Sequence, residues 1–262
     1  MRHLGKIRKG LRKLAIISMS KKNFNVGVLG YGEVGQAIAR FYPHPKIKDL
    51  KRDDGLEKVE VLHVCIPWNE SFVKTALLEI NRINPKLVII HSTVKPGTTK
   101  EISRRVKAMV VHSPIRGVHP NLYEGIKVFV KYIGADNLKV GIAAQKHLRQ
   151  LGLKTKVFSP SATTELGKIL DTTYYGVCIA WHGEMAKICQ KLGVPFEAAV
   201  TDFNTTYNEG YQKLGKKNVV RPVLFPPQQG IGGHCVIPNA EILNKFYQSG
   251  FVKSLLQYKK KN

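Results

Sequence analysis

The chain has 262 residues, of which 43% are hydrophobic and 23% charged, as in an ordinary globular protein with one large or two modest domains. No apolar run approaches the roughly 20 residues that span a bilayer, so a membrane-spanning protein is excluded. The four cysteines are far apart and form no CxxC pair. This spacing argues against a zinc site and a disulfide framework and predicts a reducing, cytoplasmic setting.

The formal net charge is +24, and part of it lies in a basic leader over residues 1–22, which contains eight Lys or Arg and no acid. We predict that this leader is disordered; an amphipathic targeting or membrane-surface helix is the alternative. The remaining positive charge favours a small anionic substrate, such as a sugar nucleotide or a sugar phosphate. The basic residues are not interleaved with aromatics, so we expect neither specific nucleic-acid binding nor membrane binding.

From residue 23 to residue 159, short β-branched runs alternate with helical stretches, which predicts an α/β fold: a Rossmann-type domain with a mainly parallel sheet. The predicted strands cover residues 25–29, 46–48, 59–66, 87–91, 109–112, 128–133 and 155–158. The predicted helices cover residues 35–42, 71–83, 98–106 and 136–151.

The strongest motif is a GxGxxG turn that follows the first predicted strand and opens the first predicted helix. In this context the first glycine makes a tight turn, the second lets the backbone approach a pyrophosphate, and the third allows close helix packing. The helix N-terminus adds positive potential. We therefore predict a dinucleotide site formed by Gly30, Tyr31, Gly32, Glu33, Val34 and Gly35.

An acidic residue about 20 positions later would accept hydrogen bonds from the adenosine ribose. Asp49 has this spacing, and its carboxylate favours NAD over NADP. The neighbouring Lys48, Lys51 and Arg52 leave accommodation of a 2′-phosphate open as the alternative.

Residues 160–262 are predicted to form a helical domain. Apolar residues at spacings of three and four predict one long helix over residues 163–192, in which Gly167, Gly176 and Gly183 are tolerable if another helix packs closely. A helix of this length is typical of a subunit interface, so we predict a homodimer formed through it. Further helices are predicted over 196–214 and 239–257, and the last four residues are expected to fray.

A second glycine-rich motif, GIGGHC at 230–235, precedes the last predicted helix. Cys235 can act as a nucleophile there because the helix N-terminus would stabilise its thiolate, and Gly232 and Gly233 leave room for a substrate. A buried structural cysteine is the alternative.

This motif closely resembles the catalytic-cysteine loop of the UDP-glucose/GDP-mannose (nucleotide-sugar) dehydrogenase family. Three more segments resemble the family in the right order. They are VLHVCIP at 61–67 (a strand end that contacts the cofactor), HSTVKPGTT at 91–99 (its STVxPGTT loop) and TELGK at 164–168 (the start of its central helix).

The resemblance implies oxidation of an alcohol to an acid by two NAD-dependent hydride transfers. Cys235 would capture the intermediate aldehyde as a thiohemiacetal, whose oxidation gives a thioester that water hydrolyses. Lys168 would stabilise oxyanion character, although an ordinary solvated helix lysine is the alternative. Thr93 would help to position the water, and Cys65, Pro67 and Thr93 would contact the cofactor.

Three positions depart from the family's pattern. Thr172 replaces an asparagine, Ile115 replaces the glutamate of an SPE motif, and Asn239 stands as the catalytic candidate where the family has an aspartate. Because the lost carboxylates bear on water activation, we expect the hydrolytic step to be the most affected. Only 27 residues follow Cys235, which predicts a shortened form without the family's C-terminal nucleotide-sugar-binding domain.

Arg116 and His119 follow the predicted strand at 109–112, where α/β sites form. They are candidates for binding a phosphate or carboxylate of the substrate, and His119 for acid/base work. No ligand set has recognisable metal-binding spacing, so no metal is expected. The predicted function is an NAD-dependent oxidoreductase acting on a CH–OH group. The alternatives are a two-electron 3-hydroxyacid-type dehydrogenase and a non-catalytic NAD-binding regulatory protein.

Overall fold

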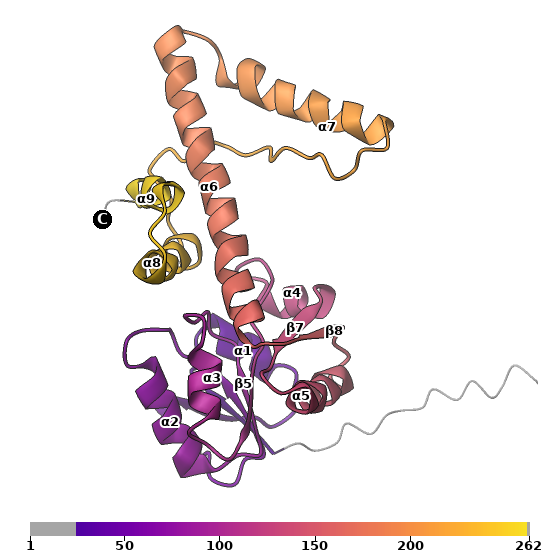
Figure 1. Cartoon of the computed structure of the whole chain (residues 1–262), viewed down its shortest axis with the longest axis vertical. Helices are drawn as coiled ribbons and strands as arrows, with labels where there is room; N and C mark the ends of the chain where they lie inside the picture. Colours follow the sequence, from indigo (N-terminus) through magenta and orange to yellow (C-terminus); the bar gives the residue numbers. More distant parts are fainter. Residues whose placement is uncertain (1–24, 261–262) are drawn as a thin grey trace, which may run out of the picture.

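The computed structural model describes residues 25–260, so the predicted leader at 1–22 lies outside the described residues. An eight-stranded sheet with flanking helices forms one end of the molecule, and a long helix extends from it (Figure 1). The predicted fold class is confirmed: a Rossmann-type, mainly parallel sheet followed by a long connecting helix and a small helical part.

The sheet has the strand order β3-β2-β1-β4-β5-β6-β7-β8. Strands β1, β2, β4, β5 and β6 are parallel, β3 is antiparallel to β2, and β7 meets β6 in an antiparallel pair only at His112 and Gly134. The bounds are β1 (Val26–Leu29), β2 (Lys46–Asp49), β3 (Arg52–Asp53), β4 (Val61–Val64), β5 (Leu87–Ile90), β6 (Met109–His112), β7 (Lys131–Gly134) and β8 (Thr155–Phe158).

Helices cover both faces of the sheet. Because side chains alternate along a strand, Val28 packs in the apolar cluster under α1 (Glu33–Ala39) and α5 (Leu138–Gln150), whereas Leu29 packs in the cluster under α2 (Phe72–Ile83). The remaining helices of this part are α3 (Thr98–Ser103) and α4 (Leu122–Val128).

One predicted boundary in this region was wrong, and two short elements were not predicted. The strand predicted at 128–133 begins only at Lys131, because Val128 ends the helix α4. That helix was not predicted: it has only 7 residues and contains Gly125, so its periodicity is weak. The two-residue strand β3 was not predicted either.

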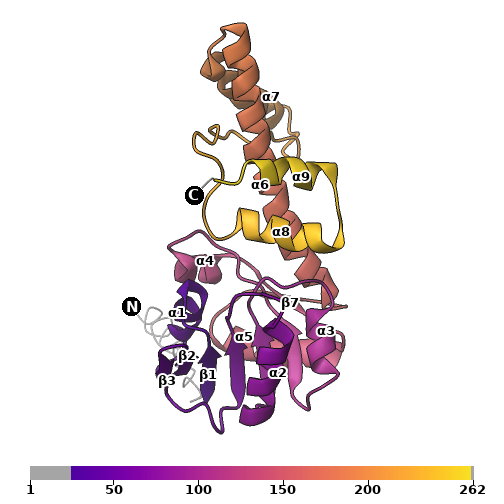
Figure 2. The same ribbon diagram turned by 90° about the vertical axis from the view of Figure 1, so that its left-hand side faces the viewer.

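The helical part is built around α6 (Ala162–Leu192). Helices α8 (Val236–Phe246) and α9 (Gly250–Gln257) pack against it and share an apolar cluster with it (Figure 2). After α6 come a π-helical segment, η1 (Glu197–Asp202), and α7 (Phe203–Lys213), which has no buried residue. The single final helix predicted over 239–257 was wrong, because the backbone is extended at Tyr247 and Ser249 and separates α8 from α9.

Two of the three glycines in α6 mark close packing. A Cβ at Gly176 would lie 2.4 Å from Val236 Cγ1, and a Cβ at Gly183 would lie 2.5 Å from the ring of Tyr258. Gly167 has open space around it. The expectation that another helix packs closely is therefore confirmed at Gly176 and Gly183 but not at Gly167.

A chain of buried polar side chains crosses the core on the α5 side. His147 Nε2 and His63 Nε2 lie 2.7 and 2.8 Å from Tyr42 Oη, and His63 Nδ1 lies 2.8 Å from His91 Nε2. His91 Nδ1 lies 2.7 Å from the carbonyl oxygen of Ser113 and 3.1 Å from Lys131 Nζ. Burial lowers the pKa of all three histidines, which keeps the chain neutral.

None of the helices within residues 25–260 combines the length and the apolar character needed to cross a membrane.

Candidate active site

The glycine turn lies between β1 and α1, at the carboxyl edge of the sheet. Gly30 has φ +91°, and a Cβ there would lie 2.8 Å from the carbonyl carbon of Cys65. A Cβ at Gly35 would lie 1.9 Å from the Gly30 carbonyl oxygen, whereas nothing lies within 4 Å of one at Gly32. Gly30 and Gly35 are thus required by contact within the protein, and the backbone at Gly32 is left open to a ligand.

Asp49 ends β2 beside this turn. Its carboxylate accepts hydrogen bonds from the Tyr31 amide at 2.9 Å and from the Leu50 amide at 2.7 Å. Two of the three nearby cations have carboxylate partners: Lys48 bonds to Glu79 at 2.8 Å, and Arg52 bonds to Asp54 at 2.7 Å. The third, Lys51, is exposed. The edge of β2 therefore presents acid, a character that suits ribose hydroxyls better than a phosphate.

The end of β4 and the loop after β5 adjoin the turn. Desolvation raises the pKa of the Cys65 thiol to about 12, so the thiol stays protonated at neutral pH. Cys65 is half-buried and Pro67 is exposed. Ser92 Oγ donates to the carbonyl of Ile66 at 2.6 Å and joins the two segments. Thr93, the next residue, is half-buried.

Glu165 anchors the long helix to that loop. Its carboxylate accepts hydrogen bonds from the Gly97 amide at 2.6 Å and the Thr99 amide at 2.7 Å, in the first turn of α3. Burial raises the pKa of Glu165, although these amide bonds oppose the shift. The family resemblance included Glu165 within a motif, but only the structure reveals that it caps α3.

His112 and Lys131 are buried residues that form hydrogen bonds to the loops after β5 and β6. His112 Nε2 donates to the Ser92 carbonyl at 3.1 Å and Nδ1 lies 2.8 Å from Thr164 Oγ1, while burial lowers the pKa of His112 to about 3. Lys131 Nζ donates to the carbonyls of Ser113 and Pro114, and burial lowers its pKa strongly. Neither supporting role was predicted, because both depend on contacts between distant segments.

Cys235 lies at the start of α8 and meets the loop that follows β6. Its Sγ lies 3.2 Å from His119 Nε2, and His119 Nδ1 bonds to the carboxylate of Glu33 in the glycine turn. The three residues come from distant parts of the chain, 116 and 86 positions apart. The structure thus brings a predicted nucleophile, a predicted substrate residue and a predicted cofactor residue into one hydrogen-bonded row.

Lys168, on the second turn of α6, belongs to this group. Its pKa is lowered, chiefly because burial desolvates the ammonium, and Arg116 adds to the shift. Cys235 and Asp171 act in the opposite direction. The predicted Lys168 and Cys235 are therefore electrostatically coupled, as a shared site requires.

The remaining predicted residues frame this group. Gly232 and Gly233 are exposed, and Arg116 is held over the rings of Tyr132 and Phe129 at 4.8 and 5.5 Å. Asn239 is buried one turn after Cys235, and its backbone N–H donates to the Cys235 carbonyl at 3.1 Å.

Two of the residues that depart from the family's pattern make packing or hydrogen-bond contacts within the protein. Ile115 is buried in the apolar cluster under α1, and the Thr172 hydroxyl donates to the Lys168 carbonyl at 2.9 Å within α6. Within residues 25–260, no three His, Cys, Asp or Glu side chains are grouped so that they could hold a metal ion.

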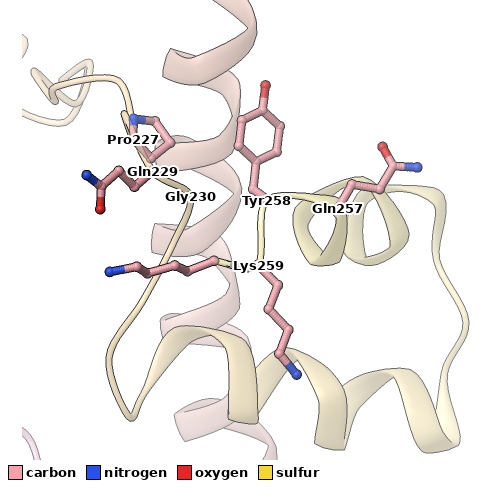
Figure 3. A pocket seen from close by; sticks show the side chains of 7 residues that line it. Pro227, Gln229, Gly230, Gln257, Tyr258 and Lys259 are labelled. Atoms are coloured by element: carbon pink, nitrogen blue, oxygen red, sulfur yellow. The ribbon is translucent and has the colours of Figure 1, made fainter. Parts of the chain in front are cut away.

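The C-terminal residues support the cysteine loop. Ile231 forms a parallel bridge with Lys259. The Ile231 amide donates to the Tyr258 carbonyl at 2.6 Å, and the Lys260 amide donates to the Ile231 carbonyl at 3.1 Å. Fraying was therefore wrong for Lys259 and Lys260. A pocket beside this bridge is lined by Pro227, Gln229, Gly230, Gln257, Tyr258, Lys259 and Lys260, and contains none of the predicted site residues (Figure 3).

Fold and site together define a Rossmann-type protein with a cysteine loop against its glycine turn. No protein-family model matches the chain. The UDP-N-acetyl-D-mannosamine dehydrogenase of Methanococcus maripaludis (strain C7) is 28% identical over 230 residues, which cover 87% of this chain and 48% of the relative. That of Methanocaldococcus jannaschii is 28% identical over 206 residues, covering 72% and 45%.

Solved structures agree on the fold. The UDP-D-ManNAc dehydrogenase of Pyrococcus horikoshii has a TM-score of 0.74 at 20% identity and covers 89% of this chain and 68% of that one. The UDP-glucose dehydrogenase of Pyrobaculum islandicum has a TM-score of 0.71 at 16% identity, covering 93% and 69%. The predicted resemblance to nucleotide-sugar dehydrogenases is confirmed by these relatives, and the chain spans about half the length of the curated relatives it matches.

Proposed function

We propose that this protein is an NAD-dependent dehydrogenase that oxidises a CH–OH group of a nucleotide sugar. The observation that carries the proposal is the contact row from Cys235 through His119 to Glu33, because it joins the cysteine loop to the glycine turn. A nucleophile beside a dinucleotide turn is the arrangement that coupled oxidation and covalent capture need. The named relatives, UDP-N-acetyl-D-mannosamine dehydrogenases, support this class of substrate.

The glycine turn suits NAD. The amides of the turn and of the first turn of α1 would hold the pyrophosphate where Gly32 leaves space, and Asp49 would bind the adenosine ribose. Cys65, Pro67 and Thr93 would contact the nicotinamide half. When bound, NAD accepts a hydride from the substrate carbon.

The chain's own residues would supply the remaining chemistry. Cys235 would attack the aldehyde carbon and form a thiohemiacetal, and Lys168 would stabilise the negative oxygen or exchange a proton with it. The lowered pKa of Lys168 favours such exchange. Arg116 would bind an anionic group of the substrate, and Thr93 and Asn239 would help to position water.

We also propose a homodimer that pairs through α6 and α7. Large apolar side chains are exposed there, including Tyr174, Trp181, Leu192 and Phe203, which are 64%, 56%, 69% and 61% exposed. An unpaired monomer would leave this surface in water. A strictly monomeric species in sedimentation at micromolar concentration would contradict the dimer.

We further propose two domains and a cytoplasmic location. The boundary at residue 159 would separate a cofactor-binding domain from a helical domain that carries the cysteine loop. The four cysteines, all free in the structure, suit a cytoplasmic setting.

One alternative has an observation in its favour. The 3-hydroxyisobutyrate dehydrogenase of Mycobacterium tuberculosis matches with a TM-score of 0.64 at 12% identity, covering 88% of this chain and 91% of that one. A two-electron dehydrogenase of that kind would use Lys168 for acid/base work and leave Cys235 without a role.

The test is NADH production by the purified full chain with UDP-N-acetylmannosamine, UDP-glucose, sugar phosphates and small hydroxyacids. Two NADH per nucleotide sugar, with an acid product, would support the proposal. One NADH from a hydroxyacid would favour the alternative. Tight NAD binding without turnover of any of these compounds would overturn both in favour of a regulatory protein.

A further inference from the structure

We propose that His119 is the general acid/base of Cys235 and that Glu33 is the residue that positions His119. The inference rests on the proposed function only for the identity of the substrate. It assigns a proton-transfer group to a site whose family pattern has lost two carboxylates, at Ile115 and Asn239. It also gives a chemical task to Glu33, which lies in the glycine turn.

The hydrogen bonds define the tautomer of His119. The Glu33 carboxylate accepts only, so His119 Nδ1 carries the proton. In the neutral ring, Nε2 then has a lone pair, and this is the atom 3.2 Å from Cys235 Sγ. The imidazole is therefore oriented to take the thiol proton, with a carboxylate behind it to stabilise the imidazolium that results.

The surroundings support a separated charge pair. Glu33 faces the imidazole from α1, while Lys168 and Asp171 come from α6 and Arg116 from the same loop as His119. Lys168 is a cationic group whose charge interacts with that of Cys235 and so favours a thiolate, and Glu33 favours the imidazolium. The side chain at 115 cannot compete for the proton, because Ile115 is apolar and buried in the core. Asn239 carries an amide, which is not a base.

In the first step the S–H bond of Cys235 breaks and an N–H bond forms at His119 Nε2. The thiolate then attacks the aldehyde carbon: an S–C bond forms, the C=O π pair moves to oxygen, and the imidazolium returns its proton to that oxygen. Oxidation of this adduct would send its hydride to bound NAD and its hydroxyl proton to solvent, which leaves a thioester beside a neutral His119. Water would then attack the carbonyl carbon and give a proton to His119 Nε2. The S–C bond then breaks, the acid leaves, and the Cys235 thiolate is restored.

The pair can be tested without cofactor or substrate, by iodoacetamide alkylation of the full chain with each cysteine quantified by peptide mass spectrometry. Only the thiolate reacts, so an ordinary thiol reacts far more slowly at pH 7 than at pH 9. We expect Cys235 to react at similar rates at both pH values. His119→Gln should slow its reaction at pH 7 about tenfold, since the loss of thiolate is partly offset by higher nucleophilicity. Glu33→Gln should have a smaller effect in the same direction.

Two controls separate this effect from a general disturbance. His44→Gln removes an exposed histidine outside the cysteine loop and should leave the pH 7 rate unchanged. Cys178, half-buried on α6, is an internal reference in every sample. If wild-type Cys235 reacts as an ordinary thiol, or if His119→Gln slows Cys178 equally, the assignment is overturned. Rapid Cys235 alkylation without dehydrogenase activity would reject the proposed function while supporting the pair.

Discussion

The sheet region and the helical region differ in how completely they bury their apolar side chains. The sheet is covered on both faces, and its parallel strands bury continuous apolar runs such as Leu87–Ile90. In the helical region α8 and α9 cover one side of α6, whereas α7 buries no residue. The sheet region thus buries its apolar surface within the chain, while α7 and the distal end of α6 leave large apolar side chains exposed, which is the surface of the proposed dimer. The proposed site lies where the two regions meet.

The largest effect is expected at this junction. Cys235→Ser should lower formation of the acid product by about 10³-fold or more, because a hydroxyl is a far weaker nucleophile than a thiolate. The measurement is NADH per molecule of substrate consumed. Cys178→Ser, which changes a half-buried cysteine on α6, is the matched control and should change little. Full two-step oxidation by Cys235→Ser would indicate that the cysteine loop plays no part in the chemistry.

The two regions should respond differently to loss of an aromatic side chain. Phe72 is 1% exposed and Phe203 is 61% exposed. Phe72→Ala should destabilise the fold by about 3–5 kcal/mol, and Phe203→Ala by about 0.5 kcal/mol or less. Urea unfolding followed by the fluorescence of Trp68, in a Trp181→Phe background, measures both. Phe203→Ala should instead weaken dimer formation in sedimentation; equal stability losses would contradict the comparison.

The sheet region should also be the acid-sensitive one. Burial lowers the folded-state pKa of His112 to about 3 and of His147 to about 4, so only the unfolded chain binds these protons between those values and about 6.5. Stability should therefore fall as the pH drops below about 6.5, by up to about 1.4 kcal/mol per pH unit for each such histidine. The raised pKa of Glu165 has the opposite sign but is a single group. A urea midpoint unchanged between pH 7.5 and pH 5 would count against neutral buried histidines.

The smallest effects are expected on α6 itself, where two glycines provide a matched pair. Gly176→Val should cost about 1–3 kcal/mol, because its Cβ would already lie 2.4 Å from Val236 Cγ1. Gly167→Ala has open space and should stabilise the helix by up to about 1 kcal/mol. Thermal unfolding of the two variants gives the signs. The same sign for both would mean that α8 and α9 are not packed on α6 as described.

Much of the secondary structure could be predicted from local sequence patterns. The glycine turn, six of the seven predicted strands near their observed positions, and α6 to within one residue of its predicted bounds all follow from patterns that near neighbours determine. Asp49 was predicted from spacing alone and does lie beside the turn, bonded to the Tyr31 amide. The glycine-rich loop indicated Cys235 and the family resemblance indicated Lys168, and in the structure the charge of Cys235 influences the pKa of Lys168.

Other features depend on the tertiary structure. The antiparallel meeting of β6 and β7, the break after α8 and the chain of buried histidines have no local signature, because each is decided by which distant segments pack together. The same holds for the site: sequence alone suggested Glu33, His119 and Cys235 for three separate roles. Only the folded chain, by closing loops of 86 and 116 residues, makes them one hydrogen-bonded row.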